Sequence, residues 1–227
     1  LERPAFTDHD KLATFDVVLA NPPYSIKQWN RDAWQTDPWG RNFLGTPSQG
    51  RADYAFFQHI LKSMDSGSGR SAILFPHGVL FRKEEAEMRQ KLVEADLVEC
   101  VLGLGKNLFY NSPMEACIVI CRNNKPVEQQ GKVLFIDAVD EVTRERSMSF
   151  LEEEHQEHIA KVYHGFDDEA GFAHVADLDE IAAQDFSLSI PLYVKNNGVQ
   201  EGQGEYETRS LGQLWRSWEE DGRAFWQ

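Results

Sequence analysis

The chain has 227 residues, of which 41% are hydrophobic, and a formal net charge of −14. This length allows one domain with a sizeable core, with or without a tail. No apolar run reaches the ~20 residues of a transmembrane helix and the N-terminus has no signal-peptide pattern, so we expect a cytoplasmic protein without a membrane partner. The three cysteines form no C-x-x-C pair, which favours reduced thiols over a disulfide framework.

The negative charge is concentrated in the later part of the chain. Residues 1–134 contain 16 Lys and Arg against 16 Asp and Glu, whereas residues 135–227 contain 7 against 21. Contact with DNA is therefore not excluded for the first part. The acidic part is a poor surface for DNA and suits protein or solvent better.

The first predicted element is a short, fully buried strand over residues 15–20, which a pair of prolines ends. Strands of this type are typical of parallel sheets, whose ligands lie at the carboxyl ends of the strands. Asn21, Pro22, Pro23 and Tyr24 follow directly and are expected at such a position. The same residue types also form ordinary turns, but the place after a buried strand favours a functional site.

This tetrapeptide has the groups needed to hold an exocyclic amine. The side-chain carbonyl of Asn21 and the backbone carbonyl of Pro22 can accept the two amine hydrogens, which leaves the nitrogen lone pair free to face an electrophile. Where the amine belongs to a nucleobase, the ring of Tyr24 can lie against that base. With a sulfonium methyl as the electrophile, positioning carries most of the catalysis and no strong general base is required. A base inside a duplex is out of reach, so it must be flipped out.

Residues 25–51 have no clean periodicity and predict a long loop, which in a compact domain is usually functional or disordered. Cations and tryptophans alternate in this loop, a pattern that suits a nucleic-acid backbone with a displaced base nearby. The candidate DNA contacts are Lys27, Arg31, Arg41 and Arg51, interleaved with Trp29, Trp34 and Trp39. Each tryptophan is equally compatible with packing on the core.

Two helices and four strands are predicted between residues 53 and 137. Asp53 is expected to cap a helix in which apolar residues recur at helical spacing up to Met64. A strand over 71–75, a helix over 83–95 and strands over 97–104, 115–122 and 132–137 follow. The connection between residues 104 and 115 is too short for a crossover helix, so the strands that flank it are predicted to be antiparallel.

The remaining residues predict an acidic helix over 151–164, a capping box at Asp177–Glu180, a linker over 195–209 and a terminal helix. The terminal helix has an apolar stripe of Leu211, Leu214, Trp215 and Trp218, which docks either on this domain or on a partner. His155 and His158 lie three residues apart, but without an evident third ligand no metal site is predicted.

Four segments together resemble one known family. Residues 15–24 read FDVVLANPPY, residues 52–61 ADYAFFQHIL, residues 78–82 GVLFR and residues 107–110 NLFY. In this order, from about residue 15 to about residue 194, the chain resembles the modification subunit of type I restriction-modification systems, an adenine-N6 DNA methyltransferase.

The resemblance implies an α/β fold, namely the C-terminal half of a class I S-adenosylmethionine-dependent methyltransferase (Rossmann-like) sheet with an α-helical C-terminal extension. The chain would hold the fourth to seventh strands. We divide it into a catalytic domain (1–140), an acidic helical extension (141–194), and a linker with a C-terminal helix (195–227).

The same resemblance assigns the adenine-gripping roles to Asn21, Pro22 and Tyr24, and implies that Phe109 helps to hold the flipped adenine. It implies double-stranded DNA, a specificity subunit that reads the DNA sequence and a restriction subunit as partners. A separate DNA-reading subunit would explain why this chain has little positive charge of its own.

The family's glycine-rich cofactor motif and N-terminal helical region are absent from the chain, which begins with Leu. We therefore expect a fragment, inactive in isolation, whose main S-adenosylmethionine-binding motif lies upstream and whose own cofactor contact is at most Asn21. Residues 111–115, Asn-Ser-Pro-Met-Glu, also stand where relatives have a Gly-Thr-Gly-Ile-Pro run.

Two kinds of alternative stay open. Other amine methyltransferases use the same tetrapeptide on cytosine N4, on guanine N2 of RNA or on protein glutamine, although the segments downstream of the motif speak against them. The chain is also compatible with a non-catalytic module that holds partner subunits through the acidic helix and the stripe of Trp215 and Trp218.

Overall fold

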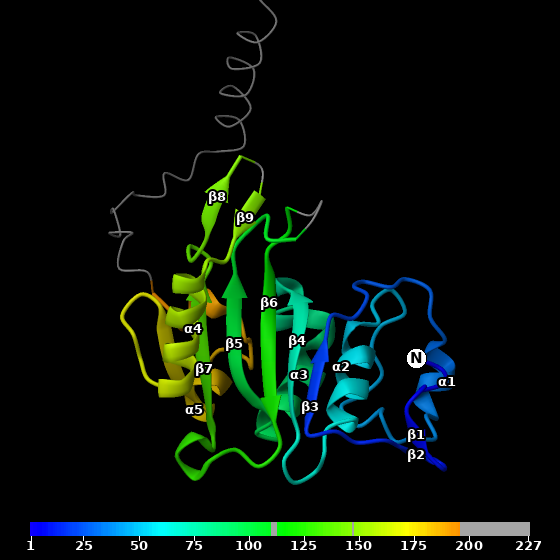
Figure 1. Cartoon of the computed structure of the whole chain (residues 1–227). Coiled ribbons are helices and arrows are strands. Elements are labelled where there is room, and N and C mark those ends of the chain that lie inside the picture. The colour runs from blue at the N-terminus through cyan, green and yellow to red at the C-terminus, as the bar shows by residue number, and fades with distance from the viewer. Residues whose placement is uncertain (110–112, 147, 196–227) are drawn as a thin grey trace, which may run out of the picture. The chain divides into compact units, whose positions relative to one another are not determined.

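The computed structural model describes residues 1–109, 113–146 and 148–195, and the chain up to Asn196 forms one compact unit. A six-stranded mixed sheet runs through this unit in the order β10-β7-β5-β6-β4-β3 (Figure 1). Its strands are β3 (Val17–Ala20), β4 (Arg70–Pro76), β5 (Val98–Leu104), β6 (Ala116–Arg122), β7 (Lys132–Ala138) and β10 (Ala173–Asp177). Tyr110, the linker beyond residue 195 and the terminal apolar stripe lie outside the described residues.

The strand directions bring four carboxyl ends to one edge of the sheet. β3 is parallel to β4 and β5 is parallel to β7, while β6 runs antiparallel to both β4 and β5. The predicted antiparallel pairing of 97–104 with 115–122 is thus confirmed, with Val101 opposite Val119. In the sheet β6 lies between β4 and β5 and runs in the opposite direction to both, so β4 and β5 are parallel to each other. The carboxyl ends of β3, β4, β5 and β7 therefore lie at the same end of the sheet.

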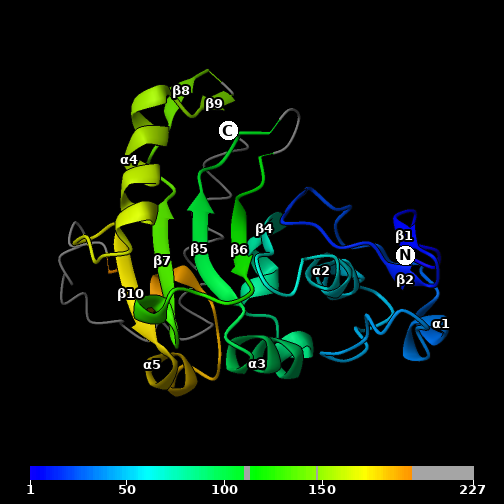
Figure 2. The ribbon, with the colours of Figure 1, turned by 60° about the horizontal axis from the view of Figure 1, so that its bottom comes forward.

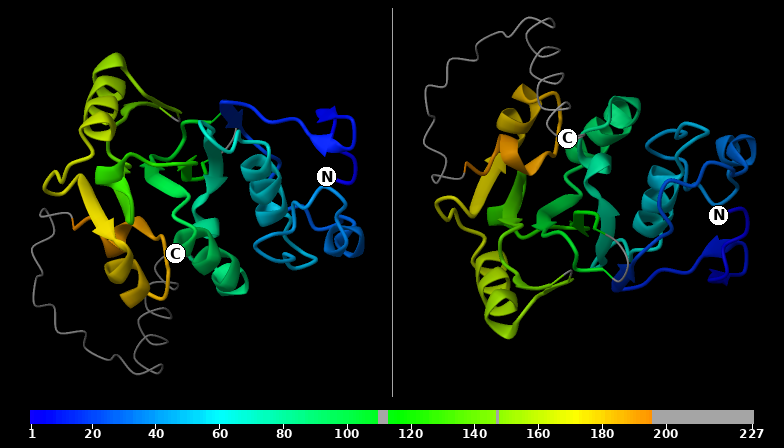
Figure 3. Two further views of the ribbon diagram at one scale, coloured as in Figure 1. Left: turned by 90° about the horizontal axis from the view of Figure 1, so that it is seen from below. Right: turned by 90° about the horizontal axis from the view of Figure 1, so that it is seen from above.

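Helices lie on both faces of the sheet (Figures 2 and 3). One face carries α2 (Asp53–Lys62), α3 (Ala86–Glu94) and α5 (Leu178–Ala183), and the other carries α4 (Glu153–Gly165). On the first face Phe57 of α2 packs on Phe75 of β4, with ring centroids 5.1 Å apart. On the second face Val162 of α4 shares a core with Leu134 and Ile136 of β7. The sheet is therefore the middle layer between two apolar cores.

Smaller elements complete the unit. They are α1 (Arg31–Gln35), the hairpin of β1 (Thr7–Asp8) and β2 (Lys11–Leu12), the hairpin of β8 (Thr143–Glu145) and β9 (Met148–Phe150), and single 3-10 turns at His77–Leu80, Lys83–Glu85, Val127–Gln129 and Ile190–Leu192. The segment 25–51, predicted as a loop, thus contains one short helix. Residues 141–194 contribute α4, β10 and α5 to the same unit, and β10 pairs with β7 in the main sheet.

The strand that precedes the Asn-Pro-Pro-Tyr sequence is not fully buried, which corrects the prediction for residues 15–20. Val17 is 50% exposed and Leu19 is 76% exposed, whereas Val18 and Ala20 pack against the core under α2. The physical reason is that β3 is the outermost strand of the sheet. On the second face of the sheet, α4 packs over β5 and β7, which lie away from β3. Uniformly apolar residues indicate a strand but do not tell whether both of its faces are covered.

Candidate active site

Three chain segments meet at the sheet edge where β3, β5 and β7 end. Asn21 directly follows β3, Phe109 lies in the connection after β5, and the hairpin of β8 and β9 follows β7 (Figure 1). All three segments line one cavity of about 640 Å³. Its lining residues are Leu19, Ala20, Asn21, Ala72, Leu74, Leu104, Leu108, Phe109, Ile118, Ser149, Phe150 and Leu151. The structure therefore brings together Asn21 and Phe109, which are 88 positions apart in the sequence.

The cavity is chemically simple. Asn21 and Ser149 are the two polar side chains of its lining, and the other lining residues are aliphatic or aromatic. A few polar groups in an otherwise apolar cavity are typical of sites that orient a small uncharged ring. The lining contains no carboxylate that could hold the hydroxyl groups of a ribose. The described residues thus fit a pocket for a base better than a complete nucleoside site.

Within the tetrapeptide, Pro22 is buried while Asn21 and Pro23 are exposed. The hydroxyl of Tyr24 donates a hydrogen bond to Oδ1 of Asn21, and the ring of Tyr24 packs against the core under α2. Burial, with smaller contributions from Cys117 and Asp53, raises the pKa of Tyr24, so this hydroxyl stays protonated and able to donate. The acceptor expected to receive an amine hydrogen is thus held in place by a neighbour in the same loop.

The end of the loop is fixed by Asp53, the first residue of α2. Its Oδ1 accepts a hydrogen bond from the backbone N–H of Ser25 at 2.7 Å, and its Oδ2 accepts one from Nη2 of Arg82 at 2.6 Å. Ser25 has a φ of 51°, in the left-handed region that non-glycine residues seldom adopt. Asp53 is therefore not the helix cap that we expected: Ala52 occupies that position without a side-chain hydrogen bond. The carboxylate instead connects the loop that follows Tyr24 to the helix layer.

Arg82 also lies beside Glu85, with Nε 2.9 Å from Oε2, although the orientation does not satisfy a hydrogen bond. Both side-chain oxygens of Glu85 are buried without a hydrogen-bond partner among the described residues. Burial raises the pKa of Glu85 to about 7; Arg82 opposes this shift and Asp53 adds to it. One cation thus lies between two buried carboxyl groups, and burial favours the protonated form of the second of them.

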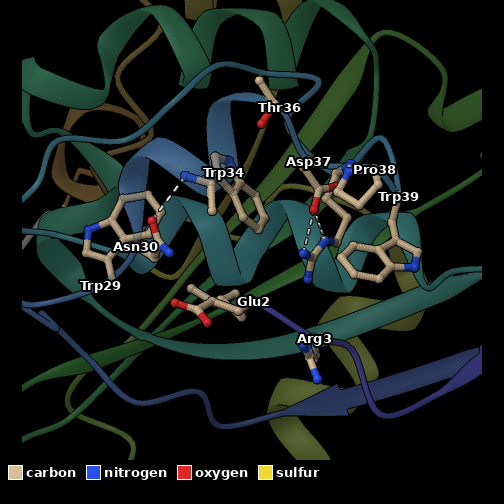
Figure 4. A pocket seen from close by; sticks show the side chains of 12 residues that line it. Glu2, Arg3, Trp29, Asn30, Trp34, Thr36, Asp37, Pro38 and Trp39 are labelled. Atoms are coloured by element: carbon tan, nitrogen blue, oxygen red, sulfur yellow. Dashed lines mark hydrogen bonds and ion pairs between the residues drawn. The ribbon is translucent and has the colours of Figure 1, made fainter.

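The predicted DNA contacts divide into two kinds. Arg41 is only 1% exposed and binds the carboxylate of Asp37 through Nε at 3.0 Å and Nη2 at 2.5 Å. Its guanidinium lies over the rings of Trp34 and Trp39, at 4.8 Å and 5.0 Å from their centroids. Figure 4 shows Trp34, Asp37 and Trp39 together in the lining of one pocket. The expectation that Arg41 faces DNA is therefore corrected, because this cation is part of an internal cluster. Asp37 and Arg41 both lie after the end of α1, so the helical i,i+4 rule did not predict this pairing.

The other three cations are more accessible. Lys27 is exposed, and Arg31 and Arg51 are half-buried, with Nε of Arg31 donating to the carbonyl of Pro47 at 2.9 Å. Among the tryptophans, Trp34 is buried and Trp29 donates from Nε1 to the carbonyl of Gln49. The loop is thus a structured cluster in which Lys27 is the cation most open to solvent.

The described residues show no group of three or more His, Cys, Asp or Glu side chains arranged to hold a metal ion. His158 lies between Glu141 at 3.2 Å and Glu169 at 2.9 Å and stacks on Phe172. Within the same part of the chain no helix is long and apolar enough to cross a membrane.

Comparison with known proteins places the chain and its fold in one family. The model of the N-6 DNA methylase family matches residues 1–202. The sheet is that of a class I S-adenosylmethionine-dependent methyltransferase. In this chain the Asn-Pro-Pro-Tyr sequence follows strand β3. The chain belongs to the N-6 DNA methylase family.

Curated relatives of the chain are named methylase subunits of type I restriction enzymes. The MjaVIII methylase subunit of Methanocaldococcus jannaschii is 36% identical over 190 residues, which cover 79% of this chain and 32% of that protein. The HindI methylase subunit of Haemophilus influenzae is 34% identical over 193 residues, 79% of this chain and 41% of that protein. The chain thus spans only a third to two fifths of the length of these relatives.

Solved structures show the same similarity. The methyltransferase subunit of a type I restriction-modification system from Streptococcus thermophilus is 34% identical and superposes with a TM-score of 0.74, over 80% of this chain and 38% of that one. The EcoKI M protein is 18% identical, with a TM-score of 0.61 over 79% of this chain and 43% of that one, and supports the fold alone. The predicted fold class and family are therefore confirmed.

Proposed function

We propose that the protein to which this chain belongs transfers a methyl group from S-adenosylmethionine to N6 of a flipped-out adenine in DNA, as the modification subunit of a type I restriction-modification complex. The observation that supports this most is the shared cavity of Asn21 and Phe109 at the carboxyl ends of the strands. Family membership supports methyl transfer to DNA, and the residues of the cavity support an amine on a planar base as the acceptor.

In this mechanism Asn21 orients the amine. Its Oδ1 accepts one N6 hydrogen, for which it exchanges the hydrogen bond from Tyr24. The backbone carbonyl of Pro22 accepts the other hydrogen, and its direction is fixed by the two prolines. With both hydrogens held, the nitrogen lone pair points out of the plane of the base, toward the methyl donor. Since this lone pair is otherwise delocalised into the ring, orientation is the main contribution of these residues.

Phe109 and the hydroxyl-bearing ring of Tyr24 are proposed to contact the faces of the base. Aromatic stacking recovers about 1 to 3 kcal/mol per base, which offsets the cost of extrusion from the duplex. Tyr24 packs on the core in the structure, so its contact with a base requires its side chain to turn away from Asn21.

S-adenosylmethionine, when bound, supplies an electrophilic methyl group on a sulfonium. Asn21, at the rim of the cavity, is the residue of this chain proposed to approach it. The cavity lining offers no further polar side chain besides Ser149, so we propose that the main cofactor contacts are made by upstream residues of the full-length protein and that this chain alone is inactive.

We also propose double-stranded DNA, a specificity subunit and a restriction subunit as partners, since the relatives are named subunits of type I restriction enzymes. Lys27, Arg31 and Arg51 are the remaining candidates for phosphate contact. The three-part division at residues 140 and 194 stays a prediction.

The substitution Asn21→Ala in the full-length protein tests the role of the tetrapeptide. Methyl incorporation into duplex DNA is expected to be lost, while DNA binding, measured by fluorescence anisotropy, stays within about twofold of wild type. Gln184→Ala, which removes an exposed amide at the C-terminal end of α5, is the control and should keep full activity. Methyl transfer by Asn21→Ala at more than a tenth of the wild-type rate would contradict the role of Asn21.

A further inference from the structure

The hairpin of β8 and β9 brings a further aromatic side chain to the cavity of Asn21 and Phe109. Phe150, the last residue of β9, lines this cavity between Ser149 and Leu151. It lies outside the four segments that carry the family resemblance. The hairpin follows β7, so Phe150 reaches the cavity from a different direction in the fold than Asn21, after β3, and Phe109, after β5.

The hairpin is attached to the connection that carries Phe109. A two-stranded hairpin is marginally stable by itself and needs a surface to pack on. The backbone N–H of Ser149 donates to the carbonyl of Asn107 at 2.9 Å, and the side chain of Ser149 is buried at this contact. Asn107 and Ser149 each lie within two positions of one of the two rings. The hydrogen bond therefore fixes the segments of Phe109 and Phe150 relative to each other.

Phe150 contributes little to the core. Its side chain is 39% exposed, and its position opposite Thr143 at the open end of β9 leaves the ring beside the cavity. An aromatic ring that stays this accessible beside an amine-binding asparagine is available to a ligand. Met148, two residues earlier on the same face of β9, is 41% exposed but does not line the cavity. The hairpin thus offers two side chains of equal exposure, only one of which is at the site.

We propose that Phe150 is a base-contacting residue, which stacks on or abuts the ring of the nucleobase whose amine Asn21 holds. The proposal rests on the function proposed above and adds a residue to it. Asn21 recognises the amine, Phe109 provides one apolar wall, and Phe150 provides another, so that the cavity selects a planar uncharged ring. A base–aromatic contact of ordinary strength corresponds to about a tenfold effect on binding of the flipped base.

The test uses the full-length protein and four variants, Phe150→Ala, Phe150→Tyr, Met148→Ala and Asn21→Ala. Phe150→Ala should lower kcat/KM for methyl transfer about tenfold, and Phe150→Tyr should restore it to within about threefold of wild type. With 2-aminopurine at the target position, Phe150→Ala should give a smaller fluorescence increase on DNA binding than wild type, because less of the base is held outside the quenching stack of the duplex. Met148→Ala should match wild type in both measurements.

An unchanged kcat/KM in Phe150→Ala, together with an inactive Asn21→Ala, would overturn this assignment and leave the proposed function intact. Equal losses in Phe150→Ala and Met148→Ala would also overturn it, since they would indicate a disturbed hairpin rather than a lost base contact. Activity in Asn21→Ala would overturn the proposed function itself and this assignment with it. Unfolding of the 227-residue chain by urea should have the same midpoint in Phe150→Ala and in Met148→Ala, because the side chains of Phe150 and Met148 are similarly exposed.

Discussion

For the single residue Asn21, two different donors compete for the side-chain carbonyl. In the structure the hydroxyl of Tyr24 donates to it, and in the proposed reaction an amine hydrogen takes that place. The exchange replaces one hydrogen bond with another, so the net change in free energy is small. The resting contact keeps the amide of Asn21 oriented before a base arrives, which lowers the entropic cost of holding the amine.

Asp53 supports this arrangement from outside the motif. Asp53→Asn should reduce kcat of the full-length protein at least tenfold with little change in KM for DNA, because an amide cannot accept from both Ser25 and Arg82. It should also lower the free energy of unfolding of the chain by about 2 kcal/mol, the value of a hydrogen bond to a charged group. Steady-state kinetics and urea unfolding measure the two effects.

The control for this substitution is Asp32→Asn, which removes the same charge from the first turn of α1, where the side chain is exposed. It should leave both quantities unchanged. A kcat of Asp53→Asn equal to that of Asp32→Asn would mean that the position of Ser25 has no influence on the loop.

Glu85 should make stability depend on pH. Its pKa is raised to about 7 in the folded protein, above the ordinary value of 4.5, so between these values the folded chain binds more protons than the unfolded chain. Its contribution to stability is therefore present below pH 4.5, falls as the pH rises through 7 and is constant above. Glu85→Gln stays neutral, so its urea midpoints, measured from pH 5 to pH 8, should fall less than those of wild type. Parallel pH profiles for the two proteins would refute the buried titration.

At the scale of the element, β3 shows which features the sequence could and could not predict. Its apolar residues and the following prolines located the strand, and the short connection after residue 104 gave the antiparallel pairing. The exposure of Val17 and Leu19 depends on which strands and helices lie next to β3, and no pattern within six residues contains that information.

The same limit applies to the contacts of side chains. Asp53 was predicted to cap a helix from the residues next to it in the sequence. Its partners in the structure, Ser25 and Arg82, lie 28 and 29 positions away. The proximity of Asn21 and Phe109 was predicted only through the family resemblance. The place of Phe150 beside them has no sequence signal, because it depends on the direction in which a hairpin leaves β7.

The edge position of β3 predicts opposite results for two adjacent substitutions. Val18→Ala should lower the free energy of unfolding of the chain by about 1 kcal/mol, because Val18 packs against the core under α2. Leu19→Ala should change it by less than about 0.5 kcal/mol, although it removes more atoms, because Leu19 is 76% exposed. Urea unfolding of both variants decides the matter. A larger loss for Leu19→Ala would mean that this face of β3 is covered.

At the scale of the whole molecule, charge and apolar surface are unevenly distributed. Lys and Arg balance Asp and Glu up to residue 134, and the excess of acidic residues lies beyond. β3 is the outermost strand of the described sheet, and its residues Val17 and Leu19 are exposed. Proteins normally pair or cover an apolar strand in this position. Both features agree with a chain that spans about a third of the length of its relatives.

N6 of adenine is the atom proposed to receive the methyl group, and the product of the reaction identifies the atom that does. Full-length protein, assembled with the specificity subunit proposed as its partner, is incubated with duplex DNA and S-adenosylmethionine labelled in the methyl group, and the DNA is digested to nucleosides and separated by chromatography. If N6 of adenine is the methyl acceptor, the label elutes as N6-methyladenine, and none appears with the Asn21→Ala protein. Label in N4-methylcytosine, or in protein instead of DNA, would contradict the proposal.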